Sequence, residues 1–230
     1  NHLSRREYLQ MVAPSSEAMR LDPEDVTANF WAANQLAAMG RTSDALALID
    51  RAQVRDPADR LMMFYKGFLL WALHQPEPAL EFSRSAYALG FSPAGVVLAY
   101  EQARQGRPED GARDYATALS GMGTKIPKAE LEAMFLGGYV GGEQRERALA
   151  LLEPHLDDGW APSLLVMLGE PERSFAAFEN NLGGLSDGYF TWLWSPEPWS
   201  TNARKHPGFQ GFAKRIGLLD YWRANGWPDL

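Results

Sequence analysis

The sequence contains no cysteine among its 230 residues. This absence excludes disulfide bonds, thiolate metal sites, cysteine nucleophiles and thiol redox chemistry, and it leaves the cellular compartment undetermined. Histidine is scarce as well, and His2, His74, His155 and His206 form neither a His-Glu-x-x-His motif nor another cluster with metal-ligand spacing. We therefore expect no metal ion and no cofactor.

Positive charge is in the minority, because 22 Lys and Arg residues stand against 29 Asp and Glu residues and give a net charge of -7. No basic block is present to neutralise phosphates, so we expect no direct binding of nucleic acid. Long apolar runs are also lacking. The longest, Leu61 to Leu73, is interrupted by Lys66 and falls short of the roughly 20 residues that a membrane-spanning helix needs, which predicts no membrane span in this segment.

The chain is rich in large apolar side chains, with 8 Trp, 8 Tyr and 11 Phe, which is too many for a disordered sequence and predicts a folded core. Residues 1–20 lack the apolar stretch of a secretory signal, and the chain opens on Asn1 rather than Met. We expect a fragment of a longer protein, located in the cytoplasm, or in the periplasm if a transmembrane helix lies upstream.

An internal repeat organises the first part of the chain. Asp22-Pro23 recurs as Asp56-Pro57, 34 residues later. Apolar and small residues at i, i+1, i+3, i+4 and i+7 mark one face of a helix three times at the same interval. These three faces are Met11, Val12, Pro14, Ser15 and Ala18, then Ala45, Leu46, Leu48, Ile49 and Ala52, then Ala79, Leu80, Phe82, Ser83 and Ala86.

Further copies follow with altered spacing, at residues 112–119 and 148–152, and a shorter one at 175–178. Each of the last five faces is preceded by a turn residue, namely Gly40, His74, Gly106, Gly142 and Gly169. Four of these are glycine, which readily adopts the left-handed conformation that ends a helix before an antiparallel partner begins. The pattern predicts successive helical hairpins and an all-α fold.

The signature Ala45, Ile49, Ala52 and Pro57 resembles that of the tetratricopeptide repeat (TPR). The resemblance implies a right-handed superhelical solenoid of antiparallel hairpins over residues 1–182, with the first repeat incomplete and the later repeats degenerate. A non-repetitive helical bundle is the alternative, since alanine-rich amphipathic helices with glycine turns occur there too. The strict recurrence favours the repeat.

Residues 183–230 break the repeat and are predicted to form an aromatic-rich C-terminal capping segment. Pro207 suits the first turn of a helix, Gly217 suits its end, and the face between them is Phe209, Phe212, Ala213 and Ile216. A solenoid exposes an apolar face on its last repeat, so we expect this capping helix to cover it.

The elements Gly217-Leu218, Tyr221-Trp222 and Trp227-Pro228-Asp229 resemble the ending of bacterial TPR arrays that follow a winged-helix domain or a class III nucleotide cyclase domain. The resemblance implies a non-catalytic sensory or protein-interaction module of a signalling protein. A transcriptional regulator is the first reading, and the regulatory region of an adenylate cyclase is an alternative. A constitutive scaffold or dimerisation module is another alternative, which leaves a homodimer open. A cysteine that members often carry after Pro-Asp is absent here.

The first helix of each hairpin lines the concave surface of TPR arrays. Carried across, the resemblance predicts a ligand or peptide groove formed by Phe30, Asn34, Phe64, Phe68 and Trp71, with Glu101 and Arg104 adding charge. Apolar anchors with flanking charges could hold a peptide, a partner protein or a small-molecule ligand. Phe64, Phe68 and Trp71 fit the core between repeats equally well. Phe30 stands where chaperone-binding members carry a clamp lysine, which argues against a chaperone cofactor.

Signatures of catalysis are missing. No Gly-x-Ser-x-Gly elbow occurs, and Gly121-Met122-Gly123-Thr124-Lys125 lacks the order of a phosphate-binding loop. His155, near Asp157 and Asp158, is the one acid-base candidate, and a hydrogen-bonded structural histidine is the simpler interpretation. We predict that the chain is not an enzyme.

Overall fold

The computed structural model describes residues 21–181 and 187–229, and within these residues the fold is all-helical, without a β-strand. Five consecutive helix pairs come first. They are α3 (Val26–Ala38) with α4 (Thr42–Gln53), α5 (Arg60–Ala72) with α6 (Pro76–Ala88), α7 (Gly95–Arg104) with α8 (Pro108–Gly121), α9 (Lys128–Val140) with α10 (Gly142–Leu152), and α11 (Ala161–Met167) with α12 (Pro171–Asn181). The short 3-10 helices η1 (Ser92–Ala94) and η2 (Glu153–His155) lie between pairs.

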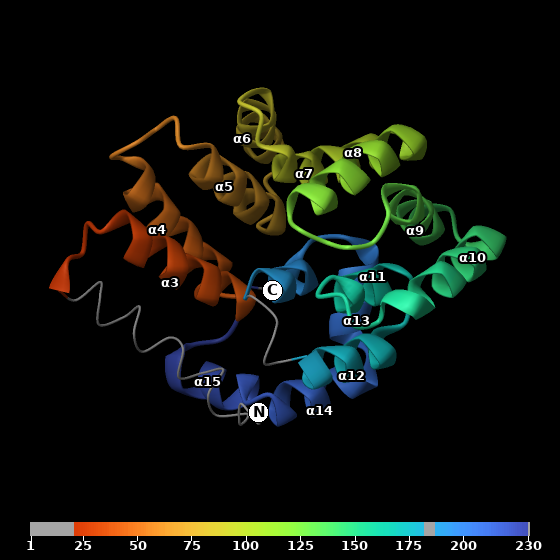
Figure 1. Cartoon of the computed structure of the whole chain (residues 1–230). Coiled ribbons are helices and arrows are strands. Elements are labelled where there is room, and N and C mark those ends of the chain that lie inside the picture. The colour runs from red at the N-terminus through yellow and green to blue at the C-terminus, as the bar shows by residue number, and fades with distance from the viewer. Residues whose placement is uncertain (1–20, 182–186, 230) are drawn as a thin grey trace.

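A closing segment follows the five pairs. It consists of the 3-10 helix η3 (Asp187–Trp194), α13 (Pro198–Lys205), α14 (Pro207–Arg215) and α15 (Leu218–Asn225). Figure 1 shows the hairpins following a curved path, with the closing segment running along its open side back towards α3. The prediction of an all-α chain is therefore confirmed. The first predicted helical face, Met11 to Ala18, lies outside the described residues.

The turns between paired helices confirm the predicted left-handed positions. All five turn residues have positive φ, at 76° for Gly40, 59° for His74, 77° for Gly106, 57° for Gly142 and 74° for Gly169. The 34-residue interval is also present, because α5 begins 34 residues after α3 and α6 begins 34 residues after α4. The first two pairs thus repeat at the same interval, and all five pairs are reversed at a residue with positive φ.

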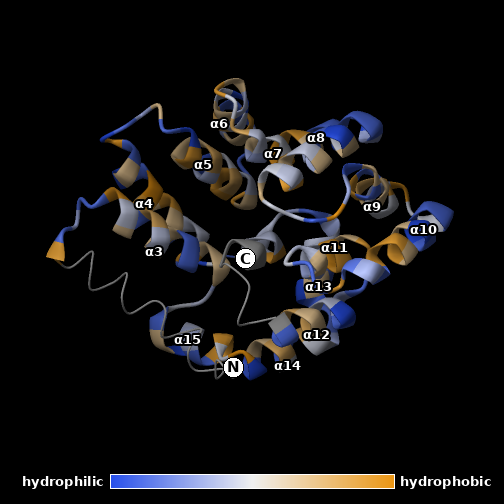
Figure 2. Ribbon diagram, viewed as in Figure 1, coloured by the Kyte–Doolittle hydropathy of each residue, from blue (hydrophilic) through white to orange (hydrophobic). Residues whose placement is uncertain are grey.

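The predicted helical faces pack inside the hairpins. Ala45, Ile49 and Ala52 of α4 are buried, and so are Ala79, Ser83 and Ala86 of α6. Close approach of α5 to α6 depends on Gly67, since a Cβ there would lie 2.5 Å from Ser83 Oγ and 3.0 Å from the Ala79 carbonyl oxygen. Figure 2 shows α5 as apolar along most of its length and the beginnings of α8 and α10 as polar.

The closing segment packs against the last hairpin. The helix predicted from Pro207 is α14, in which Phe212 and Ala213 are buried. Its C-cap residue Ile216 is buried too, and Gly217 follows at φ 84°. Phe212 stacks on Phe175 of α12 with ring centroids 4.6 Å apart.

The closing segment also returns to the first hairpin, which the sequence did not indicate. Trp194 Nε1 donates to the Ala38 carbonyl at 2.7 Å, and Trp222 Nε1 donates to the Met39 carbonyl at 2.8 Å. The Asp229 amide donates to the Gly40 carbonyl at 2.9 Å. The turn after α3 is therefore fixed by residues from the far end of the chain.

None of the helices in residues 21–181 and 187–229 is both long enough and apolar enough to cross a membrane.

The turn at His74 yields a first prediction about stability. Left-handed φ costs a residue with a Cβ roughly 1 kcal/mol relative to glycine, so His74→Gly should raise the free energy of unfolding by about 0.5–1 kcal/mol. Gly106 is the matched control, because a Cβ there meets no heavy atom within 4 Å and Gly106→Ala adds only backbone strain. That variant should lose about 1 kcal/mol. Urea denaturation measures both, and an unchanged or lower midpoint for His74→Gly would contradict the prediction.

Candidate functional site

An aromatic pocket of about 430 Å³ opens between the first two hairpins and the closing segment. Its position follows from α5, where Asp59 Oδ1 accepts from the amides of Leu61 at 2.8 Å and Met62 at 3.1 Å and so fixes the first turn. Residues of α5 then recur along one side of the helix and face α3, η1, the end of α8 and η3. The pocket is lined mainly by Phe30, Leu61, Phe64, Tyr65, Phe68, Phe91, Met122, Trp160, Thr191 and Trp192.

The aromatic walls hold one another in place. Phe30 meets Tyr65 edge to face at a centroid distance of 4.8 Å, and Phe64 meets Phe91 at 5.6 Å. On the opposite wall, Trp192 meets Phe68 at 4.8 Å. The first and third contacts are edge to face and the Phe64–Phe91 contact is tilted, and such contacts fix ring orientation as well as adding apolar area. The pocket is therefore formed without a ligand, and its size falls within the ~300–1,000 Å³ of small-molecule sites.

Among the described residues that line the pocket, Arg60 is the one charged side chain, and it lies at the exposed rim. Its guanidinium carbon lies 5.9 Å from the centroid of the Phe91 ring, and its Nη1 donates to the Leu89 carbonyl at 3.4 Å. Every other side chain of the lining is neutral. The pocket thus combines an apolar interior with a single positive group at its mouth.

A second constellation surrounds Glu197, at the N-cap position of α13. Its side chain is fully buried, and three helices each supply one hydrogen-bond donor. Oε1 accepts from Arg104 Nη2 at 2.9 Å and from Trp71 Nε1 at 3.3 Å, and Oε2 accepts from the Tyr139 hydroxyl at 3.1 Å. The Arg104 guanidinium carbon also lies 4.5 Å above the Trp71 ring. We call this set, Trp71, Arg104, Tyr139 and Glu197, the carboxylate cluster.

Burial dominates the electrostatics of the carboxylate cluster. It raises the pKa of the Glu197 carboxyl above the ordinary value, against the opposing effects of Arg104 and of the hydrogen bonds from Tyr139 and Trp71. Burial and the Glu197 carboxylate together raise the pKa of the Tyr139 hydroxyl. Burial likewise raises the pKa of Tyr100 and Tyr115. These phenols keep their protons near neutral pH, and the Tyr139 hydroxyl acts as a hydrogen-bond donor rather than as a base.

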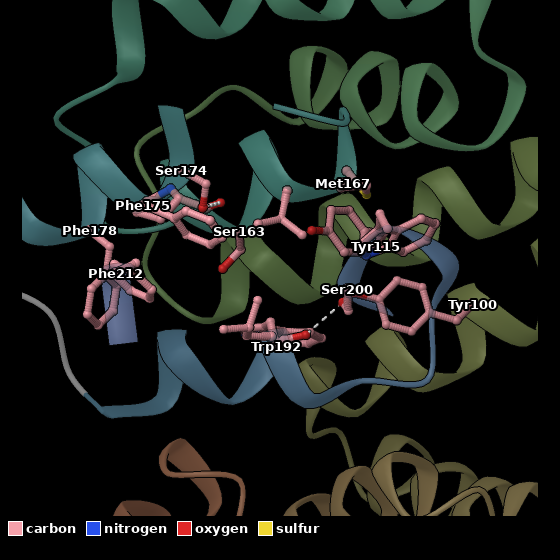
Figure 3. Close-up of a pocket in the computed structure, with 14 residues that line it drawn as sticks. Tyr100, Tyr115, Ser163, Met167, Ser174, Phe175, Phe178, Trp192, Ser200 and Phe212 are labelled. Atoms are coloured by element: carbon pink, nitrogen blue, oxygen red, sulfur yellow. Dashed lines mark hydrogen bonds between the residues drawn. The ribbon is translucent and has the colours of Figure 1, made fainter. Parts of the chain in front are cut away.

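A smaller cavity of about 30 Å³ lies deeper and shares Trp192 with the aromatic pocket. Figure 3 shows Tyr100 and Tyr115 on one side of it and Phe175, Phe178 and Phe212 on the other, with the Ser200 hydroxyl donating to the Trp192 carbonyl at 2.9 Å. This volume has room for about two water molecules, since one needs ~10–15 Å³. It is a packing void rather than a ligand site.

The seven residues predicted for the groove fall into three groups. Phe30, Phe64 and Phe68 line the aromatic pocket, while Trp71 and Arg104 belong to the carboxylate cluster. Asn34 is 3% exposed and lies outside the lining of the pocket. Glu101 accepts from Gln105 Nε2 at 2.7 Å on the surface and joins neither group.

Sequence reasoning missed the residues that complete both groups. Tyr139 had a signal, because it follows Arg104 by 35 residues and Arg104 follows Trp71 by 33, close to the repeat interval. Glu197 had a weaker one, as a lone acid between Pro196 and Pro198 in an aromatic stretch. Phe91, Trp160 and Trp192 had none, since nothing local distinguishes them from other core aromatics.

The acid-base candidate His155, in η2, is paired with a carboxylate on α9, in the hairpin that directly precedes η2. Its Nε2 lies 2.8 Å from Glu130 Oε2. Asp158 is used in a turn, where its oxygens accept from the Thr124 hydroxyl and from the Lys125 and Trp160 amides. Across residues 21–181 and 187–229, no group of three His, Asp or Glu side chains has an arrangement that could hold a metal ion.

Neither a family model nor a curated protein matches this chain. The geometry defines a helical-hairpin protein with an open aromatic pocket and an internally occupied carboxylate cluster. The functional argument therefore rests on these two sites.

The carboxylate cluster yields a prediction about stability. Arg104→Gln leaves the Glu197 carboxylate buried without its positive partner, so the free energy of unfolding at neutral pH should fall by about 3–5 kcal/mol. Glu197→Gln should cost less, because its amide oxygen can still accept hydrogen bonds and the 39% exposed Arg104 can be hydrated. In a double-mutant cycle measured by urea denaturation, the double variant should be more stable than Arg104→Gln alone. Additive losses would contradict the pairing.

The same carboxyl yields a pH prediction. Its pKa is higher in the folded than in the unfolded chain, so the folded state binds more protons between the two values. Stability must then fall as pH rises from the unfolded pKa, about 4.3, through the raised folded pKa. The stability difference between the parent chain and Glu197→Gln, measured by urea denaturation at a series of pH values, isolates this contribution. A difference that grows in favour of the parent with rising pH would contradict it.

Proposed function

We propose that this chain is a non-catalytic ligand-binding module of a larger bacterial signalling protein, and that its ligand occupies the aromatic pocket. The observation that carries the proposal is a cavity of about 430 Å³ with aromatic walls that are already in contact with one another. The repeated hairpins and their left-handed turns support a TPR-like superhelical array. The last residues resemble the ending of bacterial TPR arrays, and this resemblance supports a module that belongs to a transcriptional regulator, with an adenylate cyclase as the alternative.

The walls of the pocket come from two parts of the chain. Phe30, Phe64 and Phe91 belong to the hairpins, whereas Thr191 and Trp192 belong to the closing segment. A ligand between them contacts both and stabilises the arrangement in which they lie together. Such a ligand shifts the population towards that arrangement by its differential affinity for it. An effector domain attached to the array would sense the shift through the position of the closing segment.

The pocket is suited to holding a ligand rather than to transforming it. Among the described residues of its lining, Arg60 is the one that carries a charge at neutral pH, and Tyr65 adds a phenol. Arginine stays protonated and is a poor general base. General acid-base or nucleophilic catalysis needs converging groups that exchange protons near neutral pH, and the lining supplies no such pair.

Binding of the neutral fluorophore N-phenyl-1-naphthylamine tests the proposal. We expect one site per chain, with enhanced emission because the pocket is apolar. Leu61→Trp, which places a larger ring in the lining, should weaken binding at least tenfold. Val54→Trp adds the same ring at a position that is 78% exposed and outside the lining, and it should bind as the parent does.

Hydrogen exchange then tests the coupling. Saturation with the fluorophore should slow amide exchange in η3 and α13 more than in α10, which has no residue in the lining. Absence of saturable binding, or equal loss of binding in the Val54→Trp control, would overturn the pocket as the site. Binding without slower exchange in the closing segment would overturn the signalling role.

A further inference from the structure

We infer that the ligand of the aromatic pocket is a small organic carboxylate, with an aromatic or branched aliphatic group inside and its carboxylate on Arg60. This inference rests on the proposed function and names its ligand class. It begins from the charge at the rim. Among the described residues, no carboxylate lies within ion-pair distance of Arg60, although the chain carries a net charge of -7.

Asp59, the acidic residue next to Arg60 in the sequence, binds backbone amides instead of Arg60. The Asp59 carboxylate accepts from the first amides of α5 at 2.8 and 3.1 Å and is turned towards the helix. The Arg60 guanidinium uses one of its five N–H groups on the Leu89 carbonyl, at a long distance of 3.4 Å. Within residues 21–181 and 187–229, no other acceptor is bound to its remaining donors at the mouth of the pocket.

The Phe91 ring determines where those donors lie. It belongs to the pocket wall, and the guanidinium carbon lies 5.9 Å from its centroid. An arginine against an aromatic face retains its planar edge for a bidentate partner. A ligand that buries a ring against Phe64 and Phe91 therefore presents its polar end to Arg60.

The carboxylate cluster shows the same chemistry within this chain. There Arg104 lies over the Trp71 ring at 4.5 Å and binds the carboxylate of Glu197 at 2.9 Å. At the pocket, Arg60 lies over Phe91, and the residues that the structure describes supply no carboxylate partner for it. The interior of the pocket offers no second cation, so a singly charged planar carboxylate fits better than a phosphate monoester, which carries nearly two charges at neutral pH.

Competition against N-phenyl-1-naphthylamine tests this ligand class. The competitors are 1-naphthaleneacetate and 1-naphthaleneacetamide, which share the ring and differ in charge. The acetate should bind about fivefold more tightly at low salt, and the ratio should shrink at high salt. Arg60→Gln should bring the ratio to about one, whereas Arg60→Lys should retain part of it.

Arg84 provides the matched control, because it is an exposed arginine outside the lining and Arg84→Gln should keep the parent ratio. Thermal unfolding followed by circular dichroism verifies that each variant is folded. If the fluorophore binds but both competitors bind equally, or if Arg60→Gln keeps the preference, the carboxylate inference is overturned and the proposed function stands. If the fluorophore itself does not bind, the proposed function is overturned.

Discussion

The arrangement of this protein depends on one buried carboxylate. Glu197 has no exposed side-chain surface, and removing a carboxylate from water is costly unless hydrogen bonds and a positive charge replace the lost hydration. Here the replacements come from three different hairpins, through Trp71, Arg104 and Tyr139. These contacts compensate for the lost hydration only while α5, α7 and α9 keep their mutual positions. A polar contact in a mainly apolar interior therefore selects one relative placement of these helices among those that apolar packing alone would tolerate.

The aromatic pocket depends on that carboxylate through a short piece of chain. Trp192 forms one wall and lies five residues before Glu197. Between them the backbone is tied by Ser200, whose hydroxyl donates to the Trp192 carbonyl at 2.9 Å and lies 2.8 Å from the Ser195 hydroxyl. Trp192 is thus tied through Ser200 to α13, the helix whose N-cap is Glu197. Loss of the hydrogen bonds to Glu197 would therefore be expected to move Trp192. A ligand against Trp192 would in turn favour or disfavour those hydrogen bonds.

The sequence predicted what is set by neighbours along the chain. The faces of α4 and α6, the left-handed turn at His74 and the helix from Pro207 each follow from a pattern of a few residues. The path of the closing segment does not, because its contacts join residues such as Met39 and Trp222 that no local pattern relates. The residues predicted for the groove are divided between two places in the structure for the same reason. Phe68 and Trp71 are both apolar residues of α5, and the sequence does not distinguish them. Contact with the distant Trp192 places Phe68 in the pocket wall, whereas a hydrogen bond to the distant Glu197 places Trp71 in the carboxylate cluster.

Arg104 and Arg60 differ in solvent exposure at the site of the ion pair, and this exposure decides whether each arginine can exchange its partner. At Arg104 the carboxylate belongs to the same chain and is fully desolvated, so its release requires the closing segment to separate from the array. At Arg60 the guanidinium is exposed, and an ion pair there is worth only ~0.2–1 kcal/mol. Affinity at the open site must then come from burial of apolar area, at about 25 cal/mol per Å², while the charge selects among ligands of similar shape. Such a division allows binding that is both reversible and selective. The rings supply the affinity for any ligand of suitable shape, whereas the exposed charge distinguishes carboxylates from neutral ligands and adds little to the barrier to dissociation.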